Sequence, residues 1–347
     1  MNHRIFLVGV AFAAALGCSP EHESKMLKGI EAYRQGAIEE GTLRAAEGLV
    51  LSSKIAKFKK GEPVASGNVI YTRSDNTVRL HHPCAASIDV PAQFKHLACD
   101  PATGRIAATN GLELRIFGKG GASESSVVVS QDKKDKADSL AVSDDAVFYF
   151  VGRQLHRYSI ADRKIAVVAG RDKIQPPFIG VPYYSHLYKS GTTMMVILGI
   201  AGDYTANIVD LAADSLFMKD IKVNSPRMWF ENNRLWYVSG IIGMWQLVEL
   251  SVPDKKKREV FKFRDIADVA FFPGGMLYED REGLWAVLTG PRHLVKLPAQ
   301  LKIAGMAHGA MLLTLEHATY LVDSTRLAAA IAFLAEKGPG MCAVKKF

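Results

Sequence analysis

The segment PRMWFENNRLWYVSGIIGMWQLVELSVPDKKKREVFKF, residues 226–263, decides the fold class of this chain. It predicts four short strands, at 228–230, 234–239, 246–250 and 258–263. The turn formers between them include Asn232-Asn233 and Pro253-Asp254. Short apolar runs separated by such turns are typical of antiparallel sheets. The segment is therefore interpreted as one four-stranded antiparallel unit.

Similar units recur on both sides of this segment. Each contains an apolar strand that follows a turn, and neighbouring copies are 35 to 48 residues apart. The strand centres are Ile70, Ile106, Val147, Met195, Trp236, Leu277 and Leu312. Four strands and their turns need a period near 40 residues, and stacking such units around an axis buries both faces of each. The sequence therefore predicts an all-β, seven-bladed β-propeller after a short α-helical N-terminal segment.

In architecture, residues 49–347 resemble bacterial seven-bladed propellers of the WD-repeat, YVTN and gluconolactonase-like families. The likeness lies in the repeat length, because the tryptophan-aspartate and glycine-histidine signatures of WD repeats are missing from the chain. Asp100-Pro101-Ala102-Thr103-Gly104 resembles the D-x-x-T-G turn of several propeller families and is also a good turn on its own chemistry. The resemblance implies a fold and a channel mouth, but no specific family.

The N-terminus, MNHRIFLVGVAFAAALGCSP, carries Arg4 before an apolar run and then small residues up to Cys18. The run is too short for a resident membrane helix and indicates a signal peptide over residues 1–17. Ala15-Leu16-Gly17-Cys18 resembles the lipobox of bacterial lipoproteins, although the family usually has leucine at Ala15. The resemblance implies cleavage before Cys18, lipid attachment there, and, since no aspartate follows Cys18, the outer membrane.

Residues 18–48 alternate charged and apolar side chains at nearly helical spacing. We interpret them as a lipidated tether of one or two amphipathic helices, broken near Gly36 or Gly41. The propeller then occupies 49–347. Its last blade is completed either by an N-terminal strand at 49–58 or by 327–334, which is alanine-rich and equally compatible with a helix.

Three cysteines remain after Cys18, namely Cys84, Cys99 and Cys342. An exported protein meets an oxidising compartment, so Cys84 and Cys99 could form a disulfide across a short loop. Cys99 also lies in an apolar run and could be a small core residue instead. No cysteine and histidine spacing typical of a zinc site occurs, and we expect no metal and no cofactor.

The chain carries a formal net charge of +8, with basic clusters at 54–60, 133–136 and 254–258. Basic clusters attract anionic surfaces or nucleic acid. No pattern of stacking aromatics accompanies them, so solvated loops and edges are expected rather than a nucleic-acid interface. A basic face against anionic lipid headgroups would suit a tethered protein.

Propellers bind ligands at the mouth of the central channel, at the start of the innermost strands. The repeat alignment places five polar residues there, with Met306 or His308 as a further candidate. These residues are His96, Asp138, Tyr184, Arg227 and Asp268. They form a predicted rim for a small polar ligand or a peptide, although water-filled channel mouths are polar in any case. No arrangement among them identifies a catalytic residue.

The sequence thus favours a lipid-anchored cell-envelope propeller that acts as a protein-interaction scaffold facing the periplasm. Its expected partners are the membrane, through the lipid, and an envelope protein. The alternatives are a hydrolase or lactonase-like enzyme at the channel mouth, or a small-ligand binding module. A calcium-dependent lactonase needs several convergent oxygen ligands, and a rim with only Asp138 and Asp268 beside Arg227 disfavours it.

Overall fold

The fold is an all-β, seven-bladed β-propeller with an N-terminal helix pair, as predicted. The computed structural model of the chain describes residues 20–131, 137–151, 154–168, 174, 184–200, 203–241, 243–337 and 344–346. The chain divides into two compact units. One contains Met1–Glu62, Ile241–Gln246 and Glu259–Phe347, and the other contains Pro63–Gly240 and Leu247–Arg258.

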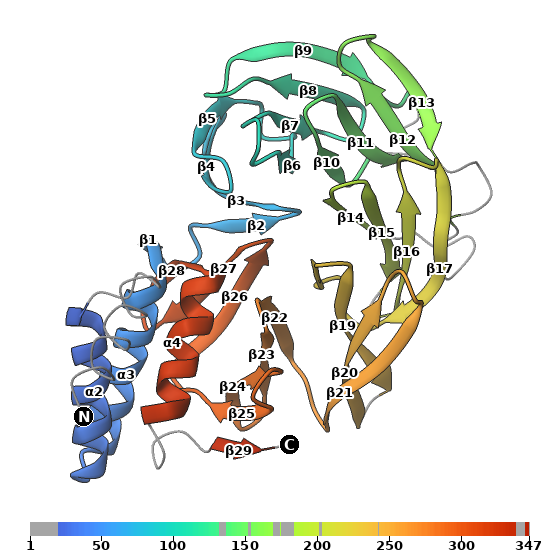
Figure 1. Cartoon of the computed structure of the whole chain (residues 1–347). Coiled ribbons are helices and arrows are strands. Elements are labelled where there is room, and N and C mark those ends of the chain that lie inside the picture. Colours follow the sequence, from blue (N-terminus) through green and yellow to red (C-terminus); the bar gives the residue numbers. More distant parts are fainter. Residues whose placement is uncertain are drawn as a thin grey trace, which may run out of the picture. The chain divides into compact units, whose positions relative to one another are not determined.

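The unit that begins at Pro63 contains four complete antiparallel sheets, drawn in blue through yellow-green in Figure 1. The first sheet consists of β2 (Val64–Ser66), β3 (Val69–Ser74), β4 (Thr77–His82) and β5 (Ala86–Asp89), and the second of β6 (His96–Cys99), β7 (Ile106–Thr109), β8 (Glu113–Phe117) and β9 (Ser123–Val128). The third sheet consists of β10 (Leu140–Val142), β11 (Ala146–Val151), β12 (Gln154–Ser159) and β13 (Lys164–Val168). The fourth consists of β14 (Tyr184–Ser190), β15 (Thr193–Ile200), β16 (Asp203–Asp210) and β17 (Ser215–Val223). In each sheet the strands follow chain order. The predicted strands around Ile70, Ile106, Val147 and Met195 are all the second strand of a sheet.

The fifth sheet is formed by residues 229–263, and it contributes residues to both units. Its strands are β18 (Trp229–Glu231), β19 (Arg234–Ile241), β20 (Met244–Ser251) and β21 (Lys256–Phe263). Asn232 and Asn233 take φ of +51° and +57° in the first turn, a conformation that asparagine tolerates better than most residues. The four predicted strands of this segment are confirmed.

Hydrophobic clusters alternate with the sheets of the second unit. One cluster joins β3, β4 and β5 to β6 and β7, and the next joins β7 and β8 to β10 and β11. Two more join β11 to β15, and β15 and β16 to β19. Each interior sheet therefore buries both of its faces, which explains why strands such as Ala146–Val151 are apolar at every position.

The first unit contains the last two sheets. They consist of β22 (Asp268–Phe272), β23 (Gly275–Asp280), β24 (Gly283–Leu288), β25 (His293–Lys296) and β29 (Val344–Lys346), and of β26 (Leu301–Ala307), β27 (Ala310–Leu315), β28 (Ala318–Asp323) and β1 (Lys54–Lys59). The fifth strand of the first sheet, β29, pairs antiparallel with β25 and is not predicted by the repeat.

The N-terminal strand β1 completes the last blade. It pairs antiparallel with β28, from Lys54 opposite Val322 to Lys59 opposite Ala318. Of the two ways to complete this blade, the structure selects the N-terminal strand. That strand is shorter than predicted, because residues 49–53 continue the preceding helix. Residues 327–334 belong to a helix instead.

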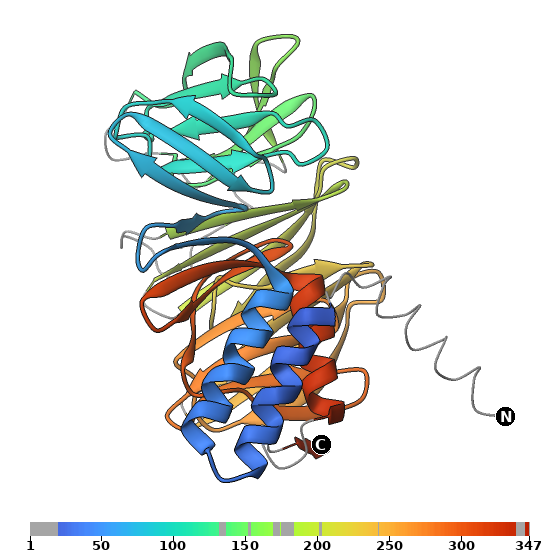
Figure 2. The same cartoon turned by 90° about the vertical axis from the view of Figure 1, so that its left-hand side faces the viewer.

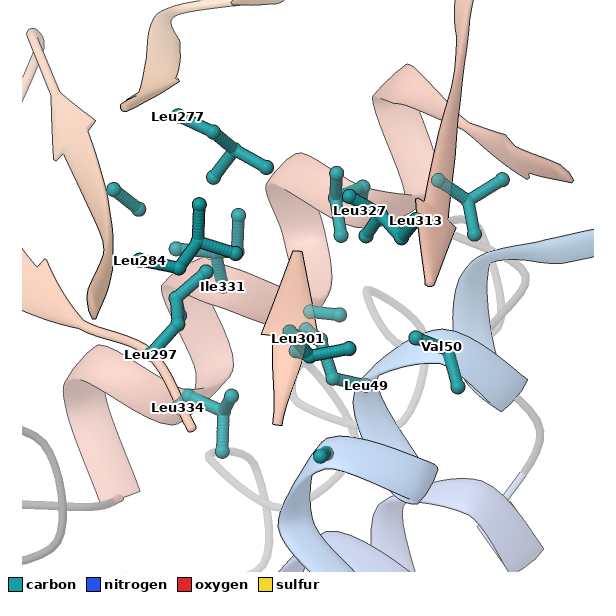
Figure 3. Close-up of a cluster of buried hydrophobic side chains, with 14 of the residues drawn as sticks. Leu49, Val50, Leu277, Leu284, Leu297, Leu301, Leu313, Leu327, Ile331 and Leu334 are labelled. Atoms are coloured by element: carbon teal, nitrogen blue, oxygen red, sulfur yellow. The ribbon is translucent and has the colours of Figure 1, made fainter. Parts of the chain in front are cut away.

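Three helices cover one side of the first unit (Figure 2), namely α2 (Pro20–Arg34), α3 (Ile38–Ser53) and α4 (Ser324–Lys337). The break between α2 and α3 falls at Gly36, at φ +89°, whereas Gly41 lies inside α3. On α4, Leu327, Ile331 and Leu334 follow helical spacing and point into a core shared with Leu49 of α3 (Figure 3).

The helix pair α2–α3 packs closely because glycines line its contact. A Cβ atom on Gly41 would lie 2.5 Å from the backbone nitrogen of Tyr33 and 2.8 Å from the carbonyl oxygen of Gly29. Real Cβ atoms do not approach backbone this closely, so a side chain here would force the two helices apart.

Replacing Gly41 by alanine should therefore lower the free energy of unfolding by about 1–3 kcal/mol, the usual cost of overpacking. This loss should appear although alanine has the higher helix propensity. The measurement is urea unfolding followed by circular dichroism. The control is Gly290→Ala, where an added Cβ meets nothing within 4 Å. Equal stability of the two variants would contradict close packing of the helix pair.

Candidate functional site

The five predicted rim residues occupy equivalent places in their sheets. His96, Tyr184 and Asp268 are the first residues of β6, β14 and β22. Asp138 and Arg227 each precede the first strand of a sheet by two residues or fewer. Four of them belong to the unit that begins at Pro63, and Asp268 belongs to the other unit. The side chain of Tyr184 lies outside the described part.

Asp138 connects two neighbouring blades. Its carboxylate accepts hydrogen bonds from the backbone nitrogen of Ser185, at 3.0 Å, and from the Ser185 hydroxyl. The Ser185 Oγ in turn lies 2.6 Å from the Oγ of Ser139. Both serines are buried, and burial raises the pKa of Asp138 in spite of these hydrogen bonds. This arrangement makes Asp138 a link between the third and fourth blades, and its polar atoms are directed at protein.

His96 and His186 lie close enough for the charge of His96 to influence the pKa of His186. Burial is the main cause that lowers the pKa of His186, in β14, to about 4, and the charge of His96 acts in the same direction. Burial also lowers the pKa of His96, with Lys95 as a second cause. Both imidazoles are therefore neutral at pH 7. A neutral imidazole can donate and accept one hydrogen bond each, which suits an uncharged polar ligand better than an anion.

Arg227 lies near the phenol of Tyr188. The Tyr188 hydroxyl donates to the carbonyl oxygen of Pro226 at 3.1 Å, and burial raises its pKa to about 12, against the influence of the Arg227 charge. The backbone nitrogen of Arg227 donates to the Ser225 hydroxyl at 3.1 Å. These bonds fix the loop between the fourth and fifth blades.

In the other unit, Asp268 stands opposite Glu279 in the sheet, and its Oδ1 accepts the backbone N–H of Val269 at 2.8 Å. The further candidates Met306 and His308 are misplaced by the sequence alignment. Met306 lies near the end of β26, its sulfur accepting the Phe271 N–H at 3.2 Å, and His308 follows that strand. Both residues lie just before the second strand, β27, and therefore at the end of the first strand, β26, rather than at its start.

Cys84 and Cys99 are joined by a disulfide, with a Cα–Cα distance of 6.3 Å. Cys99 is also fully buried, so it serves the core as well. Asn68 supports this corner, because its Oδ1 accepts the Cys99 N–H at 3.1 Å. Cys18, Cys342 and the basic cluster at 133–136 lie outside the described residues.

Ser139, Ser185 and His186 were not predicted from the sequence. The two serines lie at Asp138, and His186 lies near His96. Their position in the sequence could have identified them, because Ser139 directly follows Asp138, and Ser185 and His186 follow Tyr184 by one and two residues. Within the described ranges, no group of three or more histidine, cysteine, aspartate or glutamate side chains could hold a metal ion. No helix in the same ranges is long and apolar enough to span a membrane.

A pocket of about 690 Å³ lies within the first unit, between the helix pair and the β27–β28 turn. Lys25 and Glu47 form an ion pair at its wall, at 3.3 Å, and Lys57 lies over the Tyr320 ring at 5.6 Å. The wall carries lysines and glutamates in equal number. Such balanced charge selects neither an anionic nor a cationic ligand.

Removing the disulfide should destabilise the protein. For a loop of about 15 residues the loss of loop-closure constraint amounts to about 3 kcal/mol. In a Cys18→Ser, Cys342→Ser background, replacing both Cys84 and Cys99 by alanine should lower the free energy of unfolding by about this amount, measured as a lower urea midpoint. Adding a reductant to the background protein, which keeps Cys84 and Cys99, should have the same effect. Two alkylatable thiols in the native, non-reduced background protein would contradict the bridge.

His186 should make stability depend on pH. A histidine whose folded-state pKa is depressed stabilises the fold above its unfolded-state pKa near 6.5, and this contribution is lost as pH falls toward 4. The stability difference between the wild type and His186→Gln should therefore shrink from pH 7 to pH 4 in urea titrations. His317→Gln removes an exposed imidazole as the control, and a constant difference for His186→Gln would refute its burial in neutral form.

No protein-family model and no curated protein matches the chain. Solved structures with a similar fold include BamB from Moraxella catarrhalis, at 12% identity and TM-score 0.44, covering 79% of this chain and 89% of that one. They also include the Cps50 β-propeller domain of Myceliophteria thermophila, at 10% identity and TM-score 0.49, covering 78% of this chain and 99% of that one. A third is virginiamycin B lyase from Staphylococcus aureus, at 10% identity and TM-score 0.49, covering 77% of this chain and 98% of that one. The fold assignment rests on the seven sheets of this chain itself.

Proposed function

We propose that this protein is a lipid-anchored β-propeller of the bacterial cell envelope that acts as a scaffold for protein partners. The observation that carries the scaffold role is a pair of exposed apolar side chains at one hairpin. Ile241 and Met244 flank the turn between β19 and β20, and the two residues are 64% and 67% exposed. They are the most exposed large apolar residues of the described part.

Exposure of an apolar hairpin tip to water is unfavourable, and the free energy falls when a partner covers the tip. Burying a large apolar side chain contributes about 1.5–3 kcal/mol. Isolated exposed apolar residues are common on protein surfaces, but two on one turn form a compact anchor of the kind that dominates interface energy. The partner would therefore present an apolar depression to this hairpin.

The anchoring part of the proposal combines Cys18 with the position of the helices. Helix α2 begins at Pro20, so only Ser19 separates it from the proposed lipid-bearing residue. Helix α2 packs on α3, and α3 contacts β27 and β28. A lipid at Cys18 would accordingly hold the helical layer at the membrane, without a long linker. The absence of aspartate after Cys18 favours the outer membrane.

The disulfide between Cys84 and Cys99 supports a location outside the cytoplasm. Disulfides persist in oxidising compartments such as the periplasm and are rare where thiols are kept reduced. The bridge is buried rather than exposed, so it has the character of a structural element. The disulfide therefore supports localisation in the cell envelope independently of the N-terminal motif.

A photo-crosslinking amino acid at Met244 of the full-length chain, expressed in bacteria, should give a discrete adduct with a membrane-fraction protein. Adding Ile241→Asp should abolish the adduct, since it removes the second apolar contact. The control carries the crosslinker at Glu282, an exposed residue of the β23–β24 turn. Adducts of equal yield at Met244 and Glu282, or none at Met244, would refute the scaffold proposal.

The anchor is tested separately in the same cells. Cys18→Ser should abolish incorporation of labelled palmitate and move the chain out of the membrane fraction. Labelling that persists in Cys18→Ser would refute lipid attachment at that residue. The crosslink at Met244 reports on the partner whatever the result for Cys18.

A further inference from the structure

The pocket of about 690 Å³ in the first unit lies at one particular end of the helix pair. Lys25 of α2 and Glu47 of α3 both line it and pair with each other at 3.3 Å. Helix α2 begins five residues before Lys25, and α3 ends six residues after Glu47. The pocket is therefore at the end where α2 begins, opposite the connection at Gly36. Strand β1 and the β27–β28 turn complete its wall.

This end of the helix pair is also the end that carries the proposed lipid. Five residues of α-helix span about 7.5 Å, so Lys25 lies about that far along α2 from Pro20. Only Ser19 separates Pro20 from Cys18 in the sequence. A lipid at Cys18 would accordingly hold this pocket next to the headgroup layer of the bilayer.

The wall of the pocket carries as many positive as negative side chains. Three lysines and three glutamates line it, namely Lys25, Lys57, Lys59, Glu47, Glu62 and Glu316. The chain as a whole, in contrast, carries +8. An anion at this wall would be attracted by three groups and repelled by three, and a cation likewise. A zwitterion gains from both sets, because each of its charges can lie beside the opposite one.

One charge of each sign is available for such a ligand. Lys59 and Glu316 are both exposed, and within the described part of the chain neither side chain has an oppositely charged partner. The ammonium of Lys59 can donate hydrogen bonds to a phosphate, and the carboxylate of Glu316 can accept them from an ammonium group. A phosphate ester of an amino alcohol carries both groups in one molecule.

The rest of the pocket is apolar. It is lined there by Leu51, Phe58, Leu315, Ala318 and Tyr320. Leu315 and Tyr320 are buried, and Lys57 lies over the Tyr320 ring at 5.6 Å. Such a surface can cover the glycerol and the first methylenes of an acyl chain, which contribute by apolar burial. A free amino acid or amino alcohol phosphate has no group for this part of the pocket.

The exposure of the charges also favours a lipid over a free solute. Exposed ion pairs contribute little free energy each, because water and salt screen them. A site built from such pairs binds a dissolved ligand weakly. A lipid anchor makes the contact with a headgroup intramolecular, and the high effective concentration then makes a weak site sufficient.

We propose that this pocket binds the headgroup of a zwitterionic phospholipid, with Lys59 at its phosphate and Glu316 at its ammonium group. This inference rests on the proposed lipid anchor and adds to it a second membrane contact with a defined lipid class. It concerns a surface different from the Ile241–Met244 hairpin.

The test uses the full chain with Cys18→Ser, which cannot carry the lipid, and dihexanoyl-phosphatidylethanolamine below its micelle concentration. Amide NMR shifts of Glu47, Lys59 and His317 should show saturable binding. Two probes should each bind at least fivefold more weakly. They are dihexanoyl-phosphatidylglycerol, which lacks the ammonium group, and glycerophosphoethanolamine, which lacks the acyl chains.

Charge reversals identify the two contacts. Lys59→Glu and Glu316→Lys should each weaken binding of the phosphatidylethanolamine about tenfold, because each replaces an attraction by a repulsion. Glu316→Lys leaves an excess of positive charge and should therefore come to prefer the phosphatidylglycerol. Lys302→Glu and Glu282→Lys reverse exposed charges of the same unit outside the pocket, and should bind as the parent does. Unchanged shifts away from the pocket show that a variant is folded.

Several results would overturn the proposal. They are the absence of saturable shifts, equal binding of the two lipids by the parent, and equal losses in the pocket and control variants. Equal binding of glycerophosphoethanolamine and the lipid would identify a site for a small free zwitterion instead, which also contradicts it. The titration uses a chain without lipid, and palmitate labelling reports on Cys18, so the headgroup site and the anchor fail separately.

Discussion

The whole structure depends on the need of each sheet to bury two apolar faces. A four-stranded sheet such as β10–β13 is too small to hide Ala146–Val151, apolar at every position, without neighbours on both sides. The clusters that link successive sheets meet this need within the second unit. In the first unit the same need is met partly by helices, because α4 inserts Leu327, Ile331 and Leu334 into the core of the last two sheets. Strand β1 supplies the remaining edge, which makes the N-terminal segment part of the last blade.

This packing also explains what became of the predicted rim. Asp138 lies where a ligand-binding carboxylate was expected, but its oxygens accept hydrogen bonds from Ser185 of the next blade. Tyr188 likewise bonds to the carbonyl of Pro226. These bonds are made where neighbouring blades meet, because a buried polar group without a partner is costly. Among the surfaces that packing leaves uncovered, the β19–β20 hairpin is the one on which the proposed scaffold role rests.

Much of the fold could be predicted from repeat spacing, because turn formers and short apolar runs are local signals. The second strand of all seven blades was found in this way, including β27 around Leu312. The predictions failed where a signal is shared by two structures. Residues 49–53 continue α3, since nothing local separates the end of an amphipathic helix from the start of a strand. The choice of Met306 and His308 failed because the length of β26 cannot be read from its neighbour.

The sequence by itself determined the number of blades, the helical N-terminal segment and the candidate cysteine pair, because these follow from periodicity, amphipathic spacing and composition. Only the tertiary structure decided that β1 completes the last blade, that β29 extends the sixth, and that Asp138 bonds to Ser185. It also decided that the edge of β13 stays exposed. All four concern residues distant in sequence or the surroundings of a strand. Pairing and exposure of this kind depend on which surfaces the packed sheets bring together, and no local pattern encodes that.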